Sequence, residues 1–277
     1  MRRPALVACL ALVSLLSACG GDDGGVAATT TAAPLDATTT TTAAVEPLTV
    51  LVTNDDGIGA PGIDALVTAL EAVDDVEIVI VAPAENQSGS SDKTTDGTVT
   101  HAPATTASGA EGTAVAGFPA DAVNVALDEL GIEPDLVVSG VNEGQNVGNL
   151  AALSGTVGAA RTAIRRGIPA VAASAGIGAL ADFDAGAALV VDWIGEHRGE
   201  LDGGTAGTDA VTSFNVPGCQ AGEPKALVAV PLAEVIPEGT DPFSTADCSV
   251  DTGAPPADDV AAMVAGHLAV TQVPAEL

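Results

Sequence analysis

Short apolar runs alternate with amphipathic stretches along the chain from residue 48 onward. Four runs have the length and apolar character of strands that are buried on both faces. They cover residues 48–53, 76–81, 135–139 and 170–173. Between them apolar residues recur at spacings of three and four, which is typical of helices. The predicted helices cover residues 63–73, 123–130, about 155–166 and 183–197. This alternation predicts an α/β fold with a Rossmann-like parallel sheet covered by helices on both faces.

The N-terminal residues have the pattern of an export signal. Arg2 and Arg3 precede an apolar run, residues 5–16, that is too short to span a membrane comfortably. The run leads into Leu-Ser-Ala-Cys at residues 16–19, which resembles the lipobox of bacterial lipoproteins. The resemblance implies cleavage after residue 18 and a lipid on Cys19, which would anchor an extracytoplasmic protein to the cell membrane. The alternative is an ordinary signal peptide whose cysteine is incidental.

Residues 19–47 separate this signal from the rest of the chain. The segment consists mainly of Gly, Ala and Thr, and it lacks the apolar side chains that a core requires. As a flexible coil it would reach roughly 30 Å, enough to hold a folded domain clear of a membrane. The chain is therefore expected to comprise a signal peptide (1–18), a disordered tether (19–47) and one folded domain (48–277).

Composition limits the partners of that domain. The chain has 277 residues, with 8 Lys and Arg against 37 Asp and Glu, a formal net charge of −29 and 2% aromatic residues. Such an acidic surface repels phosphate backbones, and few aromatic side chains are available for stacking on the bases of a strand. Binding to a nucleic-acid polymer is therefore disfavoured, whereas a small-molecule or metal-centred role fits.

Two cysteines, Cys219 and Cys248, are left in the folded domain once the N-terminal segments are set aside. In an oxidising space outside the cytoplasm, such a pair usually forms a disulfide. The alternative is a zinc site, but two cysteines without a nearby histidine supply too few ligands. The sequence favours the disulfide.

Polar motifs follow directly after the predicted strands, at the sheet edge where ligands of α/β folds bind. Three such motifs are residues 53–57 (TNDDG), 82–89 (APAENQSG) and 139–146 (SGVNEGQN), and the last leads into residues 154–161 (SGTVGAAR). The adjacent carboxylates of Asp55 and Asp56 repel each other unless a cation or a proton balances them. Free amides and two hydroxyls at a helix N-terminus suit a phosphate. TNDDG alone fits a solvent-exposed turn equally well, so the interpretation depends on all four motifs.

Six blocks of sequence carry a wider resemblance. They are TNDDGIGAPGI, VAPAENQSGSS, GFPADAV, DLVVSGVNEGQNVG, SGTVGAA and GIPAVAAS. In this order and spacing they resemble the SurE family (stationary-phase survival protein) of metal-dependent 5′-nucleotidases. The resemblance covers about residues 48–175 and resumes weakly at 214–217 and 266–271. It implies a Rossmann-like fold that hydrolyses nucleoside 5′-monophosphates to nucleoside and phosphate with a divalent cation.

Carried over position by position, the resemblance implies a metal site and a phosphate site. The implied metal ligands are Asp55, Asp56, Ser88 and Asn142. The implied phosphate-side residues are Asn54, Asn146, Ser154, Gly155 and Thr156. An all-oxygen ligand set suits Mg²⁺ or Mn²⁺ better than zinc. Asp55 and Asp56 are also the catalytic candidates, because a second oxygen of either carboxylate is the nearest acceptor for the proton of an attacking water.

Several positions depart from the family pattern. Phe118 stands in place of a small polar residue, Leu153 in place of a tyrosine and Asn149 in place of an acid, which bears on substrate preference more than on the metal set. Residues 231–266 are short, acidic and rich in Pro and Gly, and they lack the basic and aromatic hairpin by which relatives exchange arms. A homodimer stays an open expectation, but pairing by those arms is not expected.

Other polar residues are expected to serve the fold. His101 follows a polar segment, residues 90–100, and a structural or solvent role is favoured over catalysis. Arg161, Arg165 and Arg166 form a basic cluster in a predicted helix and are expected to complement the dipole at its C-terminus, with a phosphate contact by Arg161 as the alternative. Asp121 is expected to be the N-cap of its helix rather than a catalytic acid.

Two functions from different classes follow. The first is a lipid-anchored extracytoplasmic phosphatase acting on nucleotides, indicated by the complete ligand set. The second is a surface lipoprotein that binds a metal or nucleotide without turnover, indicated by Phe118, Leu153 and the short segment 231–266. A phosphatase with an aspartyl nucleophile fits poorly because the Asp-x-Asp spacing is absent.

Overall fold

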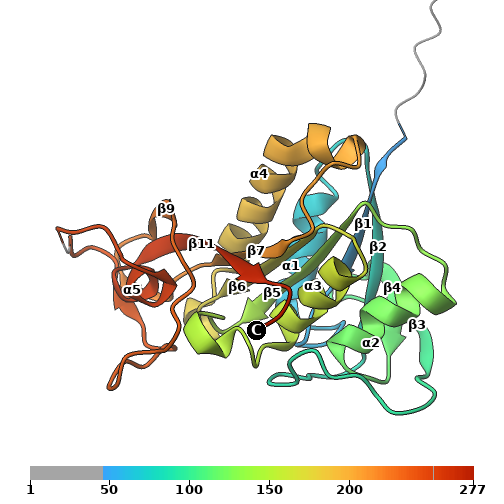
Figure 1. The fold of residues 1–277 in the computed structure, drawn as a ribbon, viewed down its shortest axis with the longest axis horizontal. Coiled ribbons are helices and arrows are strands. Elements are labelled where there is room, and N and C mark those ends of the chain that lie inside the picture. Colours follow the sequence, from blue (N-terminus) through green and yellow to red (C-terminus); the bar gives the residue numbers. More distant parts are fainter. Residues whose placement is uncertain (1–45, 252) are drawn as a thin grey trace, which may run out of the picture. The chain divides into compact units, whose positions relative to one another are not determined.

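The computed structural model of the protein describes residues 46–251 and 253–277, which form the α/β domain in Figure 1. The expected signal peptide, almost all of the tether and the lipidated Cys19 lie outside these residues and stay predictions. None of the helices in the described ranges is both long and apolar enough to cross a membrane.

In the described part of the chain, a nine-stranded mixed sheet forms the centre of the domain. Its strands are β1 (Leu48–Thr53), β2 (Val76–Pro83), β3 (His101–Thr105), β4 (Glu111–Val115), β5 (Leu136–Glu143), β6 (Ala170–Ala175), β7 (Ala210–Asn215), β9 (Lys225–Ala229) and β11 (His267–Pro274). Their order in space is β3-β4-β2-β1-β5-β6-β7-β11-β9. The run from β4 to β7 is parallel, whereas β3 and β11 run antiparallel to β4 and β7.

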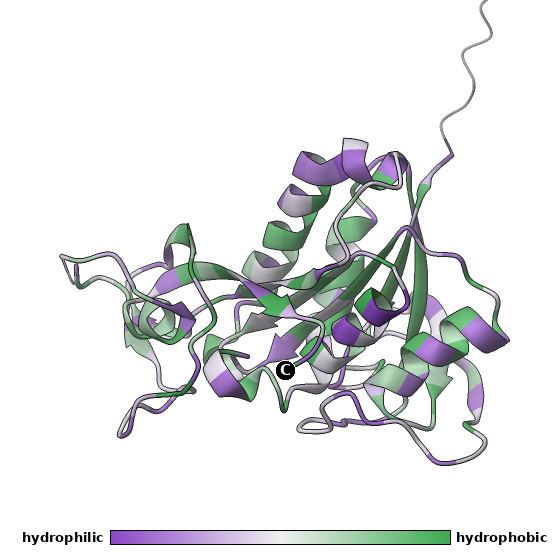
Figure 2. Ribbon diagram, in the orientation of Figure 1, coloured by the Kyte–Doolittle hydropathy of each residue, from purple (hydrophilic) through white to green (hydrophobic). Residues whose placement is uncertain are grey.

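Helices cover both faces of this sheet (Figure 1). They are α1 (Pro61–Leu70) and α4 (Phe183–Asp202) on one face, and α2 (Pro119–Asn124) and α3 (Gly155–Arg165) on the other. Successive residues of a strand point to opposite faces, so Val50 and Val52 pack with α1 and α4, and Leu51 packs with α2 and α3. Figure 2 shows apolar residues concentrated along the central strands, between the helices.

The predicted fold class is confirmed, and the four predicted strands correspond to β1, β2, β5 and β6. Three of them, β2, β5 and β6, are longer than predicted, because residues after the apolar runs still pair within the sheet: Asn142 of β5, for example, lies opposite Ser174 of β6. The core of the sheet is parallel, as predicted, but antiparallel strands extend it toward both edges. There a short hairpin connects β3 to β4, and β11 enters beside β7 in the opposite direction.

Helix α2 begins differently from the prediction. Phe118 is the N-cap residue, and Asp121 occupies the third position of the helix. The Asp121 carboxylate accepts hydrogen bonds from the Phe118 amide (2.9 Å) and from Thr95 Oγ1 (2.6 Å). The N-cap role expected for Asp121 is therefore wrong, since its carboxylate closes the helix start from within the first turn. The helix continues as a π-helical turn, Val125–Glu129, where a regular helix was predicted.

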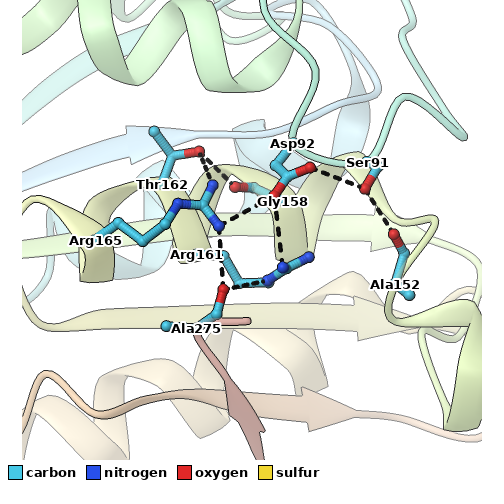
Figure 3. A network of polar contacts seen from close by, with 8 residues as sticks. All are labelled: Ser91, Asp92, Ala152, Gly158, Arg161, Thr162, Arg165 and Ala275. Carbon is cyan, nitrogen blue, oxygen red and sulfur yellow. Dashed lines mark hydrogen bonds and ion pairs between the residues drawn. The ribbon is translucent and has the colours of Figure 1, made fainter. Parts of the chain in front are cut away.

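Arg161 also has a different role from the predicted one. It is buried in the middle of α3, where its Nε donates to the Ala275 carbonyl (2.9 Å) and its Nη2 lies 3.5 Å from Asp92 Oδ2 (Figure 3). Arg165 lies in the last turn of α3, and its Nη1 is 3.1 Å from the Ala275 carbonyl oxygen and 3.1 Å from Asp92 Oδ2. The two arginines thus hold the C-terminal segment and the segment of residues 90–100 against α3. His101, the residue after that segment, begins β3 and lies 3.4 Å from Glu129.

The C-terminal part adds a two-stranded sheet, β8 (Cys219–Ala221) with β10 (Ala246–Asp247), and the helix α5 (Asp259–Val264). Cys219 and Cys248 form a disulfide with Cα atoms 5.6 Å apart, so neither thiol is free to bind zinc. Helix α5 packs in a third apolar cluster with Val147 and Ala269. This cluster joins the C-terminal part to the motif that follows β5.

Candidate functional site

Most of the predicted site residues meet in one cavity at the carboxyl ends of the central strands. The cavity measures about 250 Å³, and it brings together the ends of β1 and β5, the loop after β2 and the start of α3. Its lining residues are Asp55, Ser88, Gly89, Asn142, Glu143, Gly144, Asn146, Leu150, Leu153, Ser154 and Phe243. Asp56 lines an adjoining pocket that shares Glu143. The structure therefore assembles motifs that are up to 101 positions apart.

Asp55 is the most deeply placed carboxylate of the site, with only 2% of its surface exposed. Its Oδ1 accepts a 2.6 Å hydrogen bond from Thr156 Oγ1. Burial raises the pKa of Asp55 to about 6; the bond from Thr156 opposes this rise, and the nearby charge of Asp56 adds to it. The buried surroundings of Asp55 therefore disfavour its ionised form. A cation bound beside the carboxylate would offset this cost.

The N-terminus of α3 lies directly against Asp55. A Cβ atom on Gly155 would lie 2.7 Å from the Asp55 Cβ and 2.9 Å from Ser90 Oγ, so this approach requires glycine. Ser154 is the N-cap residue, and its Oγ accepts from the Val157 amide (3.1 Å). The positive end of the helix dipole therefore faces the cavity, which favours a bound anion.

Asp56 is held by two protein donors. Its Oδ1 accepts from Asn86 Nδ2 (2.9 Å) and its Oδ2 accepts from the Glu143 amide (2.9 Å). Partial burial raises the pKa of Asp56, and the charge of Glu143 adds to this effect, while the bond from the Glu143 amide opposes it. Within residues 46–251 and 253–277, no Lys or Arg forms an ion pair with Asp55 or Asp56.

The two amide residues are fixed by hydrogen bonds on their nitrogen side. Asn142 Nδ2 donates to the Gly144 carbonyl (2.6 Å), so its Oδ1 is left to act as a ligand. Asn146 Nδ2 donates to Ser174 Oγ (2.9 Å), and the Asn146 backbone amide donates to Asn215 Oδ1 (2.7 Å). Ser88 is exposed in the loop after β2, where it lines the cavity.

Asn54 has a clear role in the local backbone. It is fully buried, and its side chain exchanges two hydrogen bonds with Gly57, at 2.9 Å and 3.2 Å. Gly57 has a φ of 100°, a conformation that favours glycine. These bonds close the turn that presents Asp55 and Asp56. The phosphate-side role of Asn54 stays a prediction.

The donor set fits a hard divalent cation. Its potential ligands are the carboxylates of Asp55 and Asp56, the Ser88 hydroxyl and Asn142 Oδ1, all of them oxygens, as Mg²⁺ and Mn²⁺ prefer. Among the described residues, no three His, Cys, Asp or Glu side chains gather as a metal site, so this set has two charged members. Two partly desolvated carboxylates without a basic partner are the feature of the site that a cation would balance.

Sequence reasoning missed three residues that complete the site. Asn86 lies inside the second motif and Asn215 inside a weakly similar block, so position in a motif could have indicated both. Phe243 carried no such signal, because it lies in residues 231–266, which are rich in Pro and Gly and hold none of the recognised motifs, yet it lines the cavity. Phe118 instead lines a neighbouring pocket, beside Glu85 and Gln87.

Comparisons with known proteins agree on one family. A sequence profile described as "Survival protein SurE" matches residues 50–235. A "5′-nucleotidase SurE" from Variovorax paradoxus is 36% identical over 245 residues, covering 83% of this chain and 93% of that protein. Another, from Halobacterium salinarum, is 49% identical over 126 residues, and the match spans 45% of this chain and 46% of that relative.

A solved structure extends the agreement to three dimensions. The crystal structure of the SurE protein from Aquifex aeolicus matches with a TM-score of 0.64 at 28% identity, covering 83% of this chain and 94% of that one. The profile match includes every predicted metal ligand and phosphate-side residue. This chain belongs to the SurE family.

Proposed function

We propose that this protein hydrolyses nucleoside 5′-monophosphates to nucleoside and phosphate with a divalent cation, Mg²⁺ or Mn²⁺. The observation that carries the proposal is the shared cavity of Asp55, Ser88, Asn142 and Ser154, with Asp56 at its edge. The names of its relatives support the reaction class, since those from Variovorax and Halobacterium are both called 5′-nucleotidases.

The cation would be held by the carboxylates of Asp55 and Asp56, the Ser88 hydroxyl and the Asn142 carbonyl oxygen. When bound, it would supply Lewis-acid polarisation of the phosphoryl group and of an attacking water. The protein supplies the orientation: Thr156 fixes one oxygen of Asp55, while Asn86 and the Glu143 amide fix both oxygens of Asp56.

The phosphate would lie at the N-terminus of α3. There the Ser154 hydroxyl and the amides of the first helical turn would bind its oxygens, with Asn146 lining the same cavity, while the Thr156 hydroxyl holds Asp55. Because both oxygens of Asp56 accept hydrogen bonds from the protein, Asp55 Oδ2 is better placed to receive a proton from water.

The test is phosphate release by the purified protein from AMP, GMP, CMP and UMP, with Mg²⁺ or Mn²⁺ and with a chelator as control. We expect turnover that the chelator abolishes and that added metal restores. Turnover that survives the chelator would contradict the metal-dependent reaction.

A second candidate is a protein that binds a metal or nucleotide without turnover. It is favoured by Leu153, which lines the cavity in place of the tyrosine of the family pattern and is 57% exposed. Nucleotide binding measured by calorimetry without phosphate release under any metal would support this candidate over hydrolysis.

We further propose that the protein is exported and anchored to the cell membrane through a lipid on Cys19. The charged and apolar pattern of residues 2–19 supports this, and the disulfide between Cys219 and Cys248 suits an oxidising compartment. Labelling with a fatty-acid analogue should mark the wild-type protein and not Cys19→Ala; equal labelling would contradict the anchor.

A homodimer stays a prediction that sedimentation would test.

A further inference from the structure

We infer that Phe243 provides the surface on which the nucleobase of the substrate stacks. The inference rests on the proposed function, because it takes the phosphate to lie between Asp55 and the start of α3. Phe243 lies outside the family profile match, which ends at residue 235. Three features of Phe243 support this role: the position of its ring, the exposure of its side chain and the way its loop is held.

The ring lies over the loop that carries a metal ligand. Phe243 lines the same cavity as Asp55, Asn142 and Ser154. Its Cε1 lies 3.6 Å from the position that a Cβ on Gly144 would take, and Gly144 is the residue whose carbonyl fixes the Asn142 amide. The phenyl ring and the phosphate-side groups therefore belong to one continuous site.

Apolar surface is exposed where this polar cavity opens. Phe243 and Leu153 both line the cavity and are 43% and 57% exposed. Ile177, which is 45% exposed, lies 3.8 Å from that same Cβ position. Large apolar side chains grouped beside a polar centre commonly mark a ligand-binding surface.

The size of the cavity indicates which parts of a bound nucleotide would lie inside it and which would lie at its mouth. About 250 Å³ is below the roughly 300–1,000 Å³ of pockets that enclose a drug-sized ligand. The phosphate and sugar would occupy the polar interior, and the base would lie at the mouth against Phe243. Stacking between a base and an aromatic ring involves no net charge, so the strong negative charge of this chain does not oppose it.

Two hydrogen bonds to Asp241 hold the turn that carries Phe243. The Phe243 amide donates to Asp241 Oδ1 (2.9 Å), and the Ser244 amide donates to the Asp241 carbonyl (3.0 Å). Five positions after the ring, Cys248 is joined by its disulfide to Cys219. A surface that is ordered before binding loses less entropy when the ligand arrives.

Two other phenylalanines lie near the site and are the competing surfaces. Phe183 lines a pocket that contains Asp56 but none of the phosphate-side residues. Phe118 lines a pocket with neither metal ligands nor phosphate-side residues. Of these three pockets, that of Phe243 combines an aromatic ring with both groups.

The experiment compares AMP with ribose 5-phosphate, which has the same phosphate and sugar but no base. The variants are Phe243→Leu, which keeps an apolar side chain and removes the ring, and Phe243→Trp, which keeps a ring. Phe183→Leu is the matched control. We expect Phe243→Leu to lower kcat/KM for AMP by about tenfold and to leave ribose 5-phosphate unchanged, with Phe243→Trp near the wild type.

Equal losses for both substrates in Phe243→Leu, or a selective loss in Phe183→Leu instead, would overturn the inference. If no protein hydrolyses either substrate, the proposed function fails, and calorimetry of AMP and ribose 5-phosphate with Mn²⁺ decides the inference separately. A loss of affinity in Phe243→Leu that is confined to AMP would still support it, and equal affinity of wild type and variant for AMP would contradict it.

Discussion

Thr156 Oγ1 donates a 2.6 Å hydrogen bond to Asp55 Oδ1, joining the first turn of α3 to the end of β1 across 101 positions of sequence. The bond leaves the second carboxylate oxygen of Asp55 available to a ligand. It also fixes the position of the helix N-terminus relative to the carboxylate. The proposed metal site and the proposed phosphate site are therefore linked by one hydrogen bond, so a change at Thr156 should affect both.

Replacing Thr156 by valine removes the hydroxyl and keeps the shape of the side chain. We expect the free energy of unfolding to fall by about 1–3 kcal/mol, because a buried carboxylate loses a hydrogen bond. We also expect kcat/KM to fall by about tenfold or more, since Asp55 is no longer oriented. Denaturant unfolding and phosphate release measure the two effects. Thr156→Ser keeps the hydroxyl and should resemble the wild type; equal losses in both variants would contradict the assignment.

Gly155→Ala tests the close approach of α3 to Asp55. The added methyl group would lie 2.7 Å from the Asp55 Cβ, so the helix start or the carboxylate must move. Overpacking of this kind costs about 1–3 kcal/mol, and displacement within a site costs about tenfold to a hundredfold in rate. Gly59→Ala is the matched control, because a Cβ at Gly59 meets nothing within 4 Å. Similar activity of Gly155→Ala and Gly59→Ala would show that activity does not depend on the close packing of α3 against Asp55.

Asp92 should contribute stability that depends on pH. Partial burial alone would raise its pKa, but Arg161 and Arg165 outweigh this and lower it below the ordinary value of 3.8. A carboxylate whose pKa is lower in the folded state stabilises the protein above the ordinary pKa and loses this effect as pH falls through the lowered one. Asp92→Asn should therefore reduce the free energy of unfolding by about 0.5–1 kcal/mol at pH 7, because water screens this partly exposed carboxylate.

The difference between Asp92→Asn and the wild type should close as the pH falls below about 4. Asp96→Asn, a matched change at an exposed position of the same segment, should have little effect at any pH. Urea unfolding at several pH values measures both. A difference that stays constant from pH 7 to pH 3 would rule out the ion pairs in Figure 3 as its source.

Reduction of the disulfide should destabilise the C-terminal part. The disulfide closes a loop of 29 positions. Restricting the unfolded chain by a loop of this length stabilises the folded state by about 3–4 kcal/mol. Unfolding by denaturant with and without a reductant measures the loss. A thiol count on protein isolated without reductant should find neither Cys219 nor Cys248 reactive, and two reactive thiols would contradict the pairing.

The central strands and the helices that cover them could be predicted from periodicity alone. Val50 and Val52 on one face of β1, and Leu51 on the other, give the continuous apolar run that buried parallel strands require. The polar motifs after these strands then had to converge, because parallel strands end at the same edge. For this reason the sequence predicts that Asp55, Ser88 and Asn142 lie close together, and all three line one cavity.

The remaining features depend on contacts distant in sequence. Arg161 was expected at a helix end, but its partners Asp92 and Ala275 reach it only through the tertiary fold. Asn215 supports Asn146 from a strand 69 positions away. Phe243 reaches the cavity from a loop with no regular pattern. Local periodicity carries no information on such pairs, so only the folded chain reveals them.

The most direct test of the proposed metal site compares Asp55→Asn with the wild type. Calorimetry measures Mn²⁺ binding to each protein, and a separate assay measures phosphate release from AMP. Asp74→Asn, the same change at an exposed position, is the matched control. We expect Asp55→Asn to lose at least about a hundredfold in Mn²⁺ affinity, because even outer contacts of a metal site cost about 10–100-fold. It should also lose phosphate release, while Asp74→Asn matches the wild type in both. Unchanged Mn²⁺ affinity or turnover in Asp55→Asn would contradict the account.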